Sequence, residues 1–271
     1  MKQQIQPYIN YLLENAPSPF CEYIIEKELL NSDTKIVSDA YKWAKGFDLY
    51  TEMADEQFSD GSWGDFYPLD TSPAVRKKHK ITDRSTIRRL HDLSLDENDE
   101  MVAKTLDLCR SIIRGDFSSD NRRGDRAKHH VPALNVLYSF CPYDPLVAYI
   151  KVERTLSDEK ERAYMIYYWD HGPFDAVKLS DLVLPDVNEF AFWMVGLEDV
   201  SNNRYFAEFM SCDTVPFLLN LCERLIDPND NVPIMTNRYY SKVGQYSETW
   251  NNNQLKQKDV LLRVLRLLAK C

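Results

Sequence analysis

The sequence predicts an all-α protein, and three observations support this prediction. Glycine is scarce, with 8 residues in 271, whereas glycine usually makes up about 7% of a protein. Apolar residues recur at intervals of three and four in several segments, which is the spacing of amphipathic helices. A short junction motif occurs at residues 57–63 and again at 245–250, each time before an apolar helical segment.

Composition and net charge limit the kinds of protein and of binding partner that the sequence allows. Hydrophobic residues make up 44% of the chain and aromatic residues 12%, which excludes a disordered protein. The net charge of −9 disfavours nucleic acid and anionic membranes as partners, because both repel an acidic surface. No apolar run reaches the about 18 residues of a membrane span, and the first residues lack the apolar core of a signal peptide. We therefore expect no nucleic-acid partner, no membrane partner and a cytoplasmic location.

The six cysteines are scattered along the chain and form no Cys-x-x-Cys pair. Cys109 and Cys222 fall inside apolar helical segments, where a reduced cysteine behaves as a small hydrophobic residue. This usage indicates a reducing compartment and no disulfide framework.

The N-terminal region predicts three helices, over residues 5–15, 20–30 and 38–54. The third is rich in aromatic residues, namely Tyr41, Trp43, Phe47 and Tyr50.

The clearest helix is predicted over residues 99–113. Its apolar residues lie three and four apart and define one face: Met101, Val102, Leu106, Cys109, Ile112 and Ile113. Asp96 is the candidate N-cap, because an aspartate side chain can accept hydrogen bonds from the unpaired N–H groups of a first turn. Gly115 is expected to end the helix.

Four further helices are predicted over residues 132–140, 145–156, 216–226 and 259–270. The first three begin at a proline, which is favoured at the first helical position. Asp144 is a candidate cap for the second. The last helix is apolar on most sides and therefore needs neighbours around most of its circumference.

Two longer segments, residues 55–83 and 115–131, show no helical pattern. Loops of more than about 12–15 residues in a compact domain are commonly functional or disordered. No segment has the composition of an interdomain linker, so we predict one helical domain over residues 1–271.

The first junction, QFSDGSWG, contains Gln57, Asp60, Gly61 and Trp63. It resembles the glutamine–tryptophan repeat of squalene and oxidosqualene cyclases and related prenyltransferase-type proteins. The resemblance implies an α/α toroid of antiparallel helix pairs around a central cavity. It also implies that glutamine and tryptophan tie the end of one helix to the start of another.

Two further segments carry the same resemblance. Residues 85–115 are similar to a helix pair of this family. The C-terminal segment QYSETWNNNQLKQKDVLLRVLRLL is similar to its closing junction, with Gln245 and Trp250, and its last inner helix. The family's Asp-x-Asp-Asp acid is missing, and Cys212-Asp213 has no histidine to complete a zinc site. The resemblance therefore implies a scaffold diverged from its catalytic members, with neither metal nor cofactor.

The polar and aromatic cluster Tyr167-Tyr168-Trp169-Asp170-His171-Gly172 is the leading candidate site. Asp170 and His171 would supply an acid–base pair at the mouth of the toroid, with Tyr167 and Trp169 contacting substrate. A helix C-cap is the alternative interpretation, because sequence neighbours do not normally face one substrate.

A helix over residues 188–197 would add a third catalytic candidate. Glu189 and Trp193 lie four residues apart and share one helix face. If this helix is an inner one, Glu189 and the substrate-binding Trp193 line the same cavity as the leading candidate site.

A basic loop and an acidic segment are also candidates. Arg126, His129 and His130 belong to a basic loop that could bind a phosphate or carboxylate; a solvated loop is the favoured alternative. Residues 96–100 superficially resemble a magnesium–diphosphate site. Their position at a helix N-terminus explains the acids without a metal.

The leading functional hypothesis is a protein that binds a small organic ligand in an aromatic-lined central cavity. One alternative is a carbohydrate-active hydrolase or lyase on an α/α barrel, with Asp170 and Glu189 as its carboxylate pair. A second alternative is a non-enzymatic helical interaction scaffold. Catalysis and oligomeric state are left open by the sequence.

Overall fold

The computed structural model describes residues 1–15, 18–63, 89–116, 133–134, 136–148, 201, 214–229, 246 and 253–271. These residues form helices, turns and connecting segments with no strand among them, so the all-α class is confirmed for this part of the chain. No described helix combines the length and the apolar character that a bilayer crossing requires. The toroidal arrangement of helix pairs stays a prediction.

The chain divides into two compact units. Unit 1 comprises Met1–Glu52 and Val177–Cys271, and unit 2 comprises Met53–Ala176. Compact units occur within single domains as well as in separate ones. A single domain over residues 1–271 therefore stays a prediction, and each unit is described by itself.

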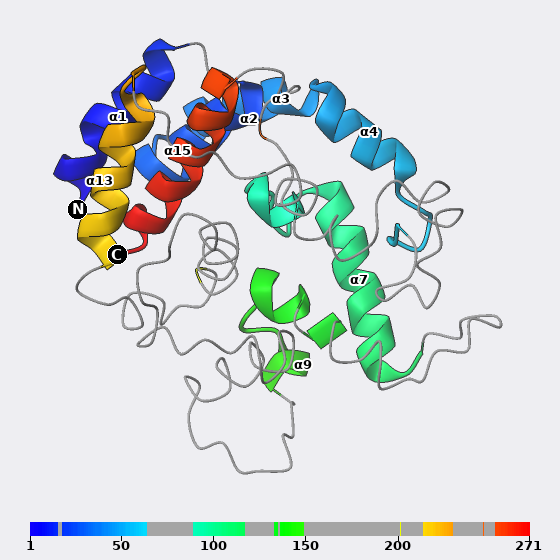
Figure 1. The fold of residues 1–271 in the computed structure, drawn as a ribbon. Coiled ribbons are helices and arrows are strands. Elements are labelled where there is room, and N and C mark those ends of the chain that lie inside the picture. Colours follow the sequence, from blue (N-terminus) through cyan, green and yellow to red (C-terminus); the bar gives the residue numbers. More distant parts are fainter. Residues whose placement is uncertain are drawn as a thin grey trace, which may run out of the picture. The chain divides into compact units, whose positions relative to one another are not determined.

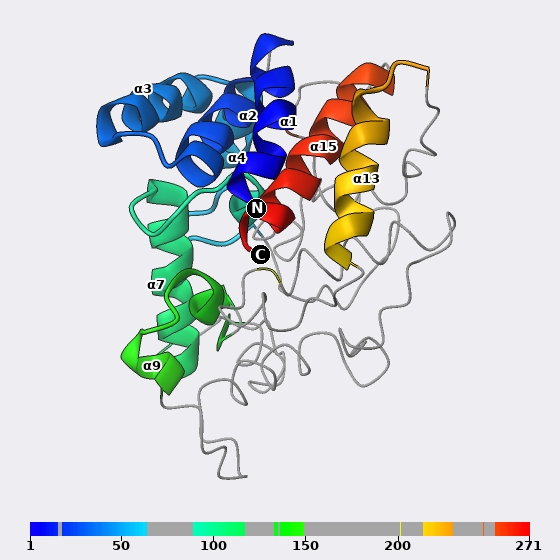
Figure 2. The same cartoon turned by 90° about the vertical axis from the view of Figure 1, so that its left-hand side faces the viewer.

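The core of unit 1 surrounds its last helix, α15 (Asn253–Ala269). This helix contacts α1 (Lys2–Glu14), α13 (Thr214–Ile226) and the π-helix η1 (Ile25–Leu30). Figure 1 and Figure 2 both show α13 alongside α15. Seven apolar side chains of α15 are at most 2% exposed: Val260, Leu261, Leu262, Val264, Leu265, Leu267 and Leu268. The predicted need for neighbours on most sides is confirmed, although the helix begins earlier than residue 259.

The two long neighbours of α15 each bury one face, as amphipathic helices do. The buried residues of α1 are Ile5, Tyr8, Ile9 and Leu12. Those of α13 are Thr214, Leu218, Leu221, Cys222 and Leu225. The predicted helix over 216–226 begins two residues earlier in the structure. Pro216 is still in the first turn, where a backbone N–H has no intrahelical partner.

The predicted helix over residues 20–30 consists of two different elements. Ser18 caps α2 (Pro19–Ile24) by accepting a hydrogen bond from Cys21 N at 3.3 Å. Residues 20–30 are helical throughout, as predicted, but the hydrogen-bond pattern changes after α2, because η1 is a π-helix. The wider i→i+5 ladder places Ile25 and Leu29 in the core.

The prediction of one helix over residues 38–54 is wrong. The structure has α3 (Thr34–Lys45) and α4 (Asp48–Glu56), separated at Gly46. Asp33 starts α3 by accepting hydrogen bonds from the backbone N–H groups of the first turn. The sequence carried both signals, an aspartate cap and a glycine stop, inside an apolar pattern that looked continuous.

Unit 2 is organised by α7 (Glu100–Arg114), which agrees with the helix predicted over 99–113. Its N-cap is Asp99, which corrects the choice of Asp96. Both aspartates precede the first apolar residue of the helix, but Asp99 lies directly before the first turn, has extended backbone angles and accepts hydrogen bonds from Met101 N and Val102 N. Gly115, with φ 81°, ends the helix in the left-handed conformation as predicted.

After α7, the described residues include two shorter helical pieces. Residues 133–134 and 136–140 are helical, within the range predicted as 132–140. Helix α9 (Pro145–Ala148) covers the start of the range predicted as 145–156. The Asp144 side chain accepts a hydrogen bond from Leu146 N at 2.9 Å, as a cap does.

Candidate functional site

Most of the predicted site residues lie outside the described part of the chain. They are Arg126, His129, His130, Tyr167, Trp169, Asp170, His171, Glu189, Trp193, Gln245 and Trp250. The hypotheses built on them stay predictions. The described part includes the first junction, residues 57–63, and Tyr246 of the second junction.

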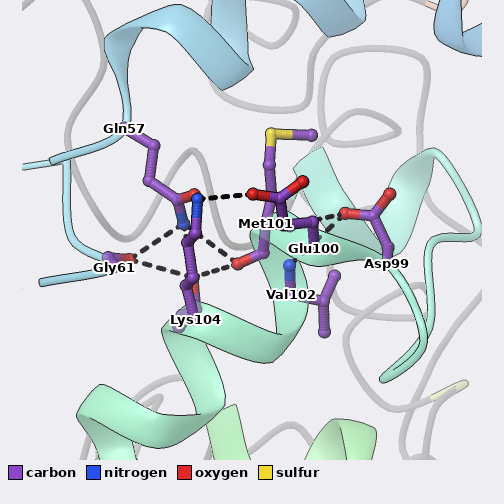
Figure 3. A network of polar contacts seen from close by, with 8 residues as sticks. Gln57, Gly61, Asp99, Glu100, Met101, Val102 and Lys104 are labelled. Atoms are coloured by element: carbon purple, nitrogen blue, oxygen red, sulfur yellow. Dashed lines mark hydrogen bonds and ion pairs between the residues drawn. The ribbon is translucent and has the colours of Figure 1, made fainter. Parts of the chain in front are cut away.

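Gln57 joins the end of α4 to the start of α7 (Figure 3). Its Nε2 donates hydrogen bonds to Met101 O at 2.9 Å and to Gly61 O at 3.1 Å. A third contact, at 3.2 Å, reaches Oγ1 of Thr105. An amide nitrogen carries two hydrogens, so the three acceptors share them. Gln57 therefore links its own loop to α7 through hydrogen bonds made within the protein.

Gly61 lies too close to α7 for any side chain. Its φ is +90°, and a Cβ added there would lie 2.3 Å from Lys104 O. The Gly61 carbonyl also accepts a hydrogen bond from Thr105 Oγ1 at 3.0 Å. The junction therefore needs glycine for two reasons, its backbone angle and its contact with the helix.

Trp63 and Asp60 complete the first junction. The Trp63 indole is buried, and its Nε1 donates a hydrogen bond to Met53 O at 2.9 Å. Asp60 Oδ1 accepts one from Ser62 N at 3.0 Å, which fixes the turn. With the amide and indole N–H groups bound to protein carbonyls, the arrangement is a tie between helices rather than a ligand site.

The acids of residues 96–100 have separate partners. Asp99 is committed to the N-terminus of α7, where it accepts hydrogen bonds from two backbone N–H groups (Figure 3). Glu100 forms an ion pair with Lys104 at 2.8 Å, and Asp96 accepts hydrogen bonds within its own turn. No group of three or more metal-binding side chains occurs among the described residues.

Tyr246, from the second junction, is 1% exposed and joins α15 to the start of α2 within unit 1. Its backbone N–H donates a hydrogen bond to Asp259 Oδ2 at 3.3 Å, and its carbonyl accepts one from Ser18 Oγ at 2.7 Å. The Arg263 guanidinium lies 4.6 Å from the centroid of its ring, within cation–π range.

Arg266 extends this cluster to the π-helix. Its NH1 donates a hydrogen bond to the Tyr246 hydroxyl at 2.7 Å. Its Nε and NH2 bind both carboxylate oxygens of Glu28, at 2.7 and 2.9 Å, which is the bidentate geometry of a strong ion pair. The charges of Glu28, Asp259, Arg263 and Arg266 balance, as is typical of a structural network.

His91 and Ser139 form a contact in unit 2 that suggests nucleophilic catalysis at first sight. His91 Nε2 lies 2.7 Å from Ser139 Oγ, and the imidazole stacks on Phe140 with centroids 3.7 Å apart. However, the Ser139 hydroxyl donates its proton to Val136 O at 2.8 Å. With that proton on Val136 O, His91 Nε2 takes the tautomer that donates to Ser139, whereas a base that activates serine accepts its proton.

Cys141 is a second reactive residue type near this contact. Its Sγ donates a hydrogen bond to Glu97 Oε2 at 3.0 Å. Burial, followed by this hydrogen bond and the Glu97 charge, raises the pKa of Cys141 to about 12. The thiol is therefore protonated near neutral pH, when a nucleophilic cysteine needs to be a thiolate.

Sequence reasoning missed the contact between His91 and Ser139 and the ion pair between Glu28 and Arg266, because the members of each are distant along the chain. His91 and Ser139 are 48 residues apart, and Glu28 and Arg266 are 238 apart. Opposite charge was the one available signal for the ion pair. It cannot select a pair in a chain with 33 basic and 42 acidic residues.

The chain gives no significant match to family models, to curated proteins or to solved structures.

Proposed function

We propose that the chain is an α/α toroid protein that binds a small organic ligand in an aromatic-lined central cavity. Its scaffold would be related to terpenoid cyclases and prenyltransferases. The observation that carries this proposal is the set of hydrogen bonds made by Gln57. They join the end of α4 to the first turn of α7, which is the role that the resemblance implies for the glutamine of the repeat.

The ligand would contact Tyr167, Trp169 and Trp193. Aromatic side chains offer large flat faces, which suit apolar ligands and the apolar faces of sugars. Asp170 and Glu189 are the proposed polar groups of the same cavity. A cytoplasmic location is also proposed, supported by the free thiols of the five described cysteines: Cys21, Cys109, Cys141, Cys222 and Cys271.

Thermal unfolding of the full chain tests the ligand proposal with three probes: farnesol, farnesyl diphosphate and cellobiose. A probe at 100 times its Kd should raise the free energy of unfolding by about 2.7 kcal/mol. We expect Trp193→Ala to remove this effect. Trp43→Ala is the control for tryptophan removal, because Trp43 is 51% exposed on α3. No stabilisation by any probe, or equal stabilisation of both variants, would contradict the proposal.

A helical interaction scaffold is the second candidate, and one observation on α3 favours it. This helix buries the small residues Ala40 and Ala44, whereas Ile36 and Trp43 are 47% and 51% exposed. Ile36 and Trp43 are seven residues apart and share the outer face of α3. A photo-crosslinking residue at position 43 should give one discrete protein adduct in cells if a partner covers this face. The same residue at Glu52 of α4 is the control.

A further inference from the structure

The ammonium group of Lys45 lies over two tyrosine rings of unit 1. Its Nζ is 5.3 Å from the centroid of Tyr41 and 5.2 Å from that of Tyr50. Lys45 ends α3, Tyr41 lies one turn earlier in the same helix, and Tyr50 belongs to α4. The turn at Gly46 thus brings the two rings to one cation.

Aromatic residues behind the two rings fix their positions. Tyr50 is buried and stacks on Phe20, with centroids 6.4 Å apart and planes 24° apart. Tyr41 packs against the buried Tyr23 at 5.2 Å. Phe20 and Tyr23 in turn meet edge to face at 6.5 Å. The spacing of Tyr41 and Tyr50 is therefore set by aromatic packing that does not involve Lys45.

The two faces form an electron-rich site for a cation. Within the described part of the chain, Lys45 makes no ion pair, so its ammonium group depends on the rings for a partner. A primary ammonium is strongly hydrated and loses that water on entry. A methylated ammonium is bound by aromatic faces at a smaller hydration cost, which is why aromatic cages recognise such groups.

We propose that Tyr41 and Tyr50 form a binding site for a methylated ammonium group, and that Lys45 occupies it as an internal competitor. The ligand is a small quaternary ammonium ion or a trimethyllysine side chain, which present the same chemistry. This site does not use the residues of the proposed central cavity. It can therefore exist whether or not that cavity binds a ligand.

Titration of the full chain with tetramethylammonium chloride tests the proposal, with ring carbons of 13C-labelled tyrosine observed by NMR. Lys45→Ala removes the competing ammonium group from the site. The affinity of this variant for tetramethylammonium should therefore exceed that of the wild type about tenfold, as expected for removal of a cation held by two rings. Lys42→Ala is the matched control, because Lys42 lies on the exposed side of α3 and pairs with Asp39. Its affinity should equal that of the wild type.

Three further arms make the result decisive. Choline and a peptide with trimethyllysine distinguish a small ion from a side chain as the ligand. The neutral isostere 3,3-dimethyl-1-butanol should not bind, because the rings attract charge. Tyr41→Leu, with its fold checked by circular dichroism, should lose binding. Equal affinity of Lys45→Ala and the wild type, or equal binding of choline and its neutral isostere, would overturn the proposal.

Discussion

The two junctions share a glutamine–aromatic–serine–acid sequence, yet their aromatic residues have opposite environments. Phe58 in the first junction is 46% exposed, whereas Tyr246 in the second is 1% exposed. In the first junction, the glutamine amide and the tryptophan indole bind backbone carbonyls. In the second, the tyrosine itself binds neighbours, through its backbone, ring and hydroxyl.

The difference shows that a junction motif specifies a local turn but does not decide which side chain is buried. The partner helix decides it. Next to Tyr246, α15 presents Asp259, Arg263 and Arg266, which contact the backbone N–H, the ring and the hydroxyl of the tyrosine. Next to Phe58, the contacts with α7 are made by Gln57 and Gly61 instead.

The largest expected effect comes from removing the buried aromatic side chain of the second junction, and the exposed one of the first junction is its control. Tyr246→Ala should lower the free energy of unfolding by about 4 kcal/mol, because it leaves a cavity and removes a partner from Arg266. Phe58→Ala should change it by less than about 0.5 kcal/mol, as exposed substitutions do. Urea unfolding followed by circular dichroism measures both. Similar losses for the two variants would break the comparison.

The next largest effect is expected at the close contact of the first junction. Gly61→Ala should destabilise the protein by about 3 kcal/mol, through its positive φ and the clash with α7. Two glycines separate these causes. Gly115 has φ 81° and open space around its Cβ position, so Gly115→Ala should cost about 1 kcal/mol. Gly46 has φ −79° and only a 3.4 Å contact, so Gly46→Ala should be nearly neutral.

Thermal and urea unfolding of these three alanine variants give the ranking. If Gly61→Ala costs no more than Gly115→Ala, the contact between the first junction and α7 does not constrain the fold.

A smaller effect is expected from the glutamine of the first junction. Gln57→Leu keeps the approximate size of the side chain but removes the donor to three acceptors, so we expect a loss of about 2 kcal/mol. Gln6 is the control, because its exposed amide reaches only the next turn of α1, at Asn10. Gln6→Leu should change the free energy of unfolding by less than about 0.5 kcal/mol. Equal effects of the two leucine variants would show that Gln57 does not tie the helices.

The smallest effect concerns Cys21, which is buried close to the second junction. Burial, and next the charge of Asp259, raise the pKa of the Cys21 thiol. A thiol whose pKa is raised in the folded state contributes stability that is fully present below the unfolded pKa and is lost as pH rises above it. At pH 9.5, one unit above an unfolded pKa of about 8.5, this loss should be about 1.4 kcal/mol.

The measurement is the free energy of unfolding between about pH 7.5 and 9.5, roughly the range over which an unfolded thiol ionises. Cys21→Ala should show a smaller decline than the wild type over this range. If the free energies of unfolding of the wild type and of Cys21→Ala decline in parallel with pH, ionisation of this thiol does not affect stability.

Helix faces were predictable from the sequence because they depend on local spacing. The apolar residues of α7 and α15 lie at helical intervals. Those of α15 are buried, and the predicted face of α7 is buried at its first four residues but only half-buried at Ile112 and Ile113. The N-cap of α7 and the helix type of η1 were not predictable, because each required a choice between similar local signals. Asp96 and Asp99 are both acceptable caps, and the residues of η1 have no pattern that separates a π-helix from an α-helix.

Site geometry was less predictable than helix geometry. The contact between His91 and Ser139 and the ion pair between Glu28 and Arg266 arise from packing of distant segments. The direction of a proton also matters. Only the structure shows that Val136 O is a second acceptor for the Ser139 proton, in competition with His91.

The dependence of α1 on α15 has a consequence for how the chain is made. Synthesis proceeds at about 5–20 residues per second, so α1 leaves the ribosome roughly 10–50 s before α15. During that interval the buried face of α1, including Ile5 and Ile9, has no partner from the helix that later covers it. Each newly made chain therefore exposes this apolar helix face for many seconds. Binding by a chaperone during that period would prevent aggregation.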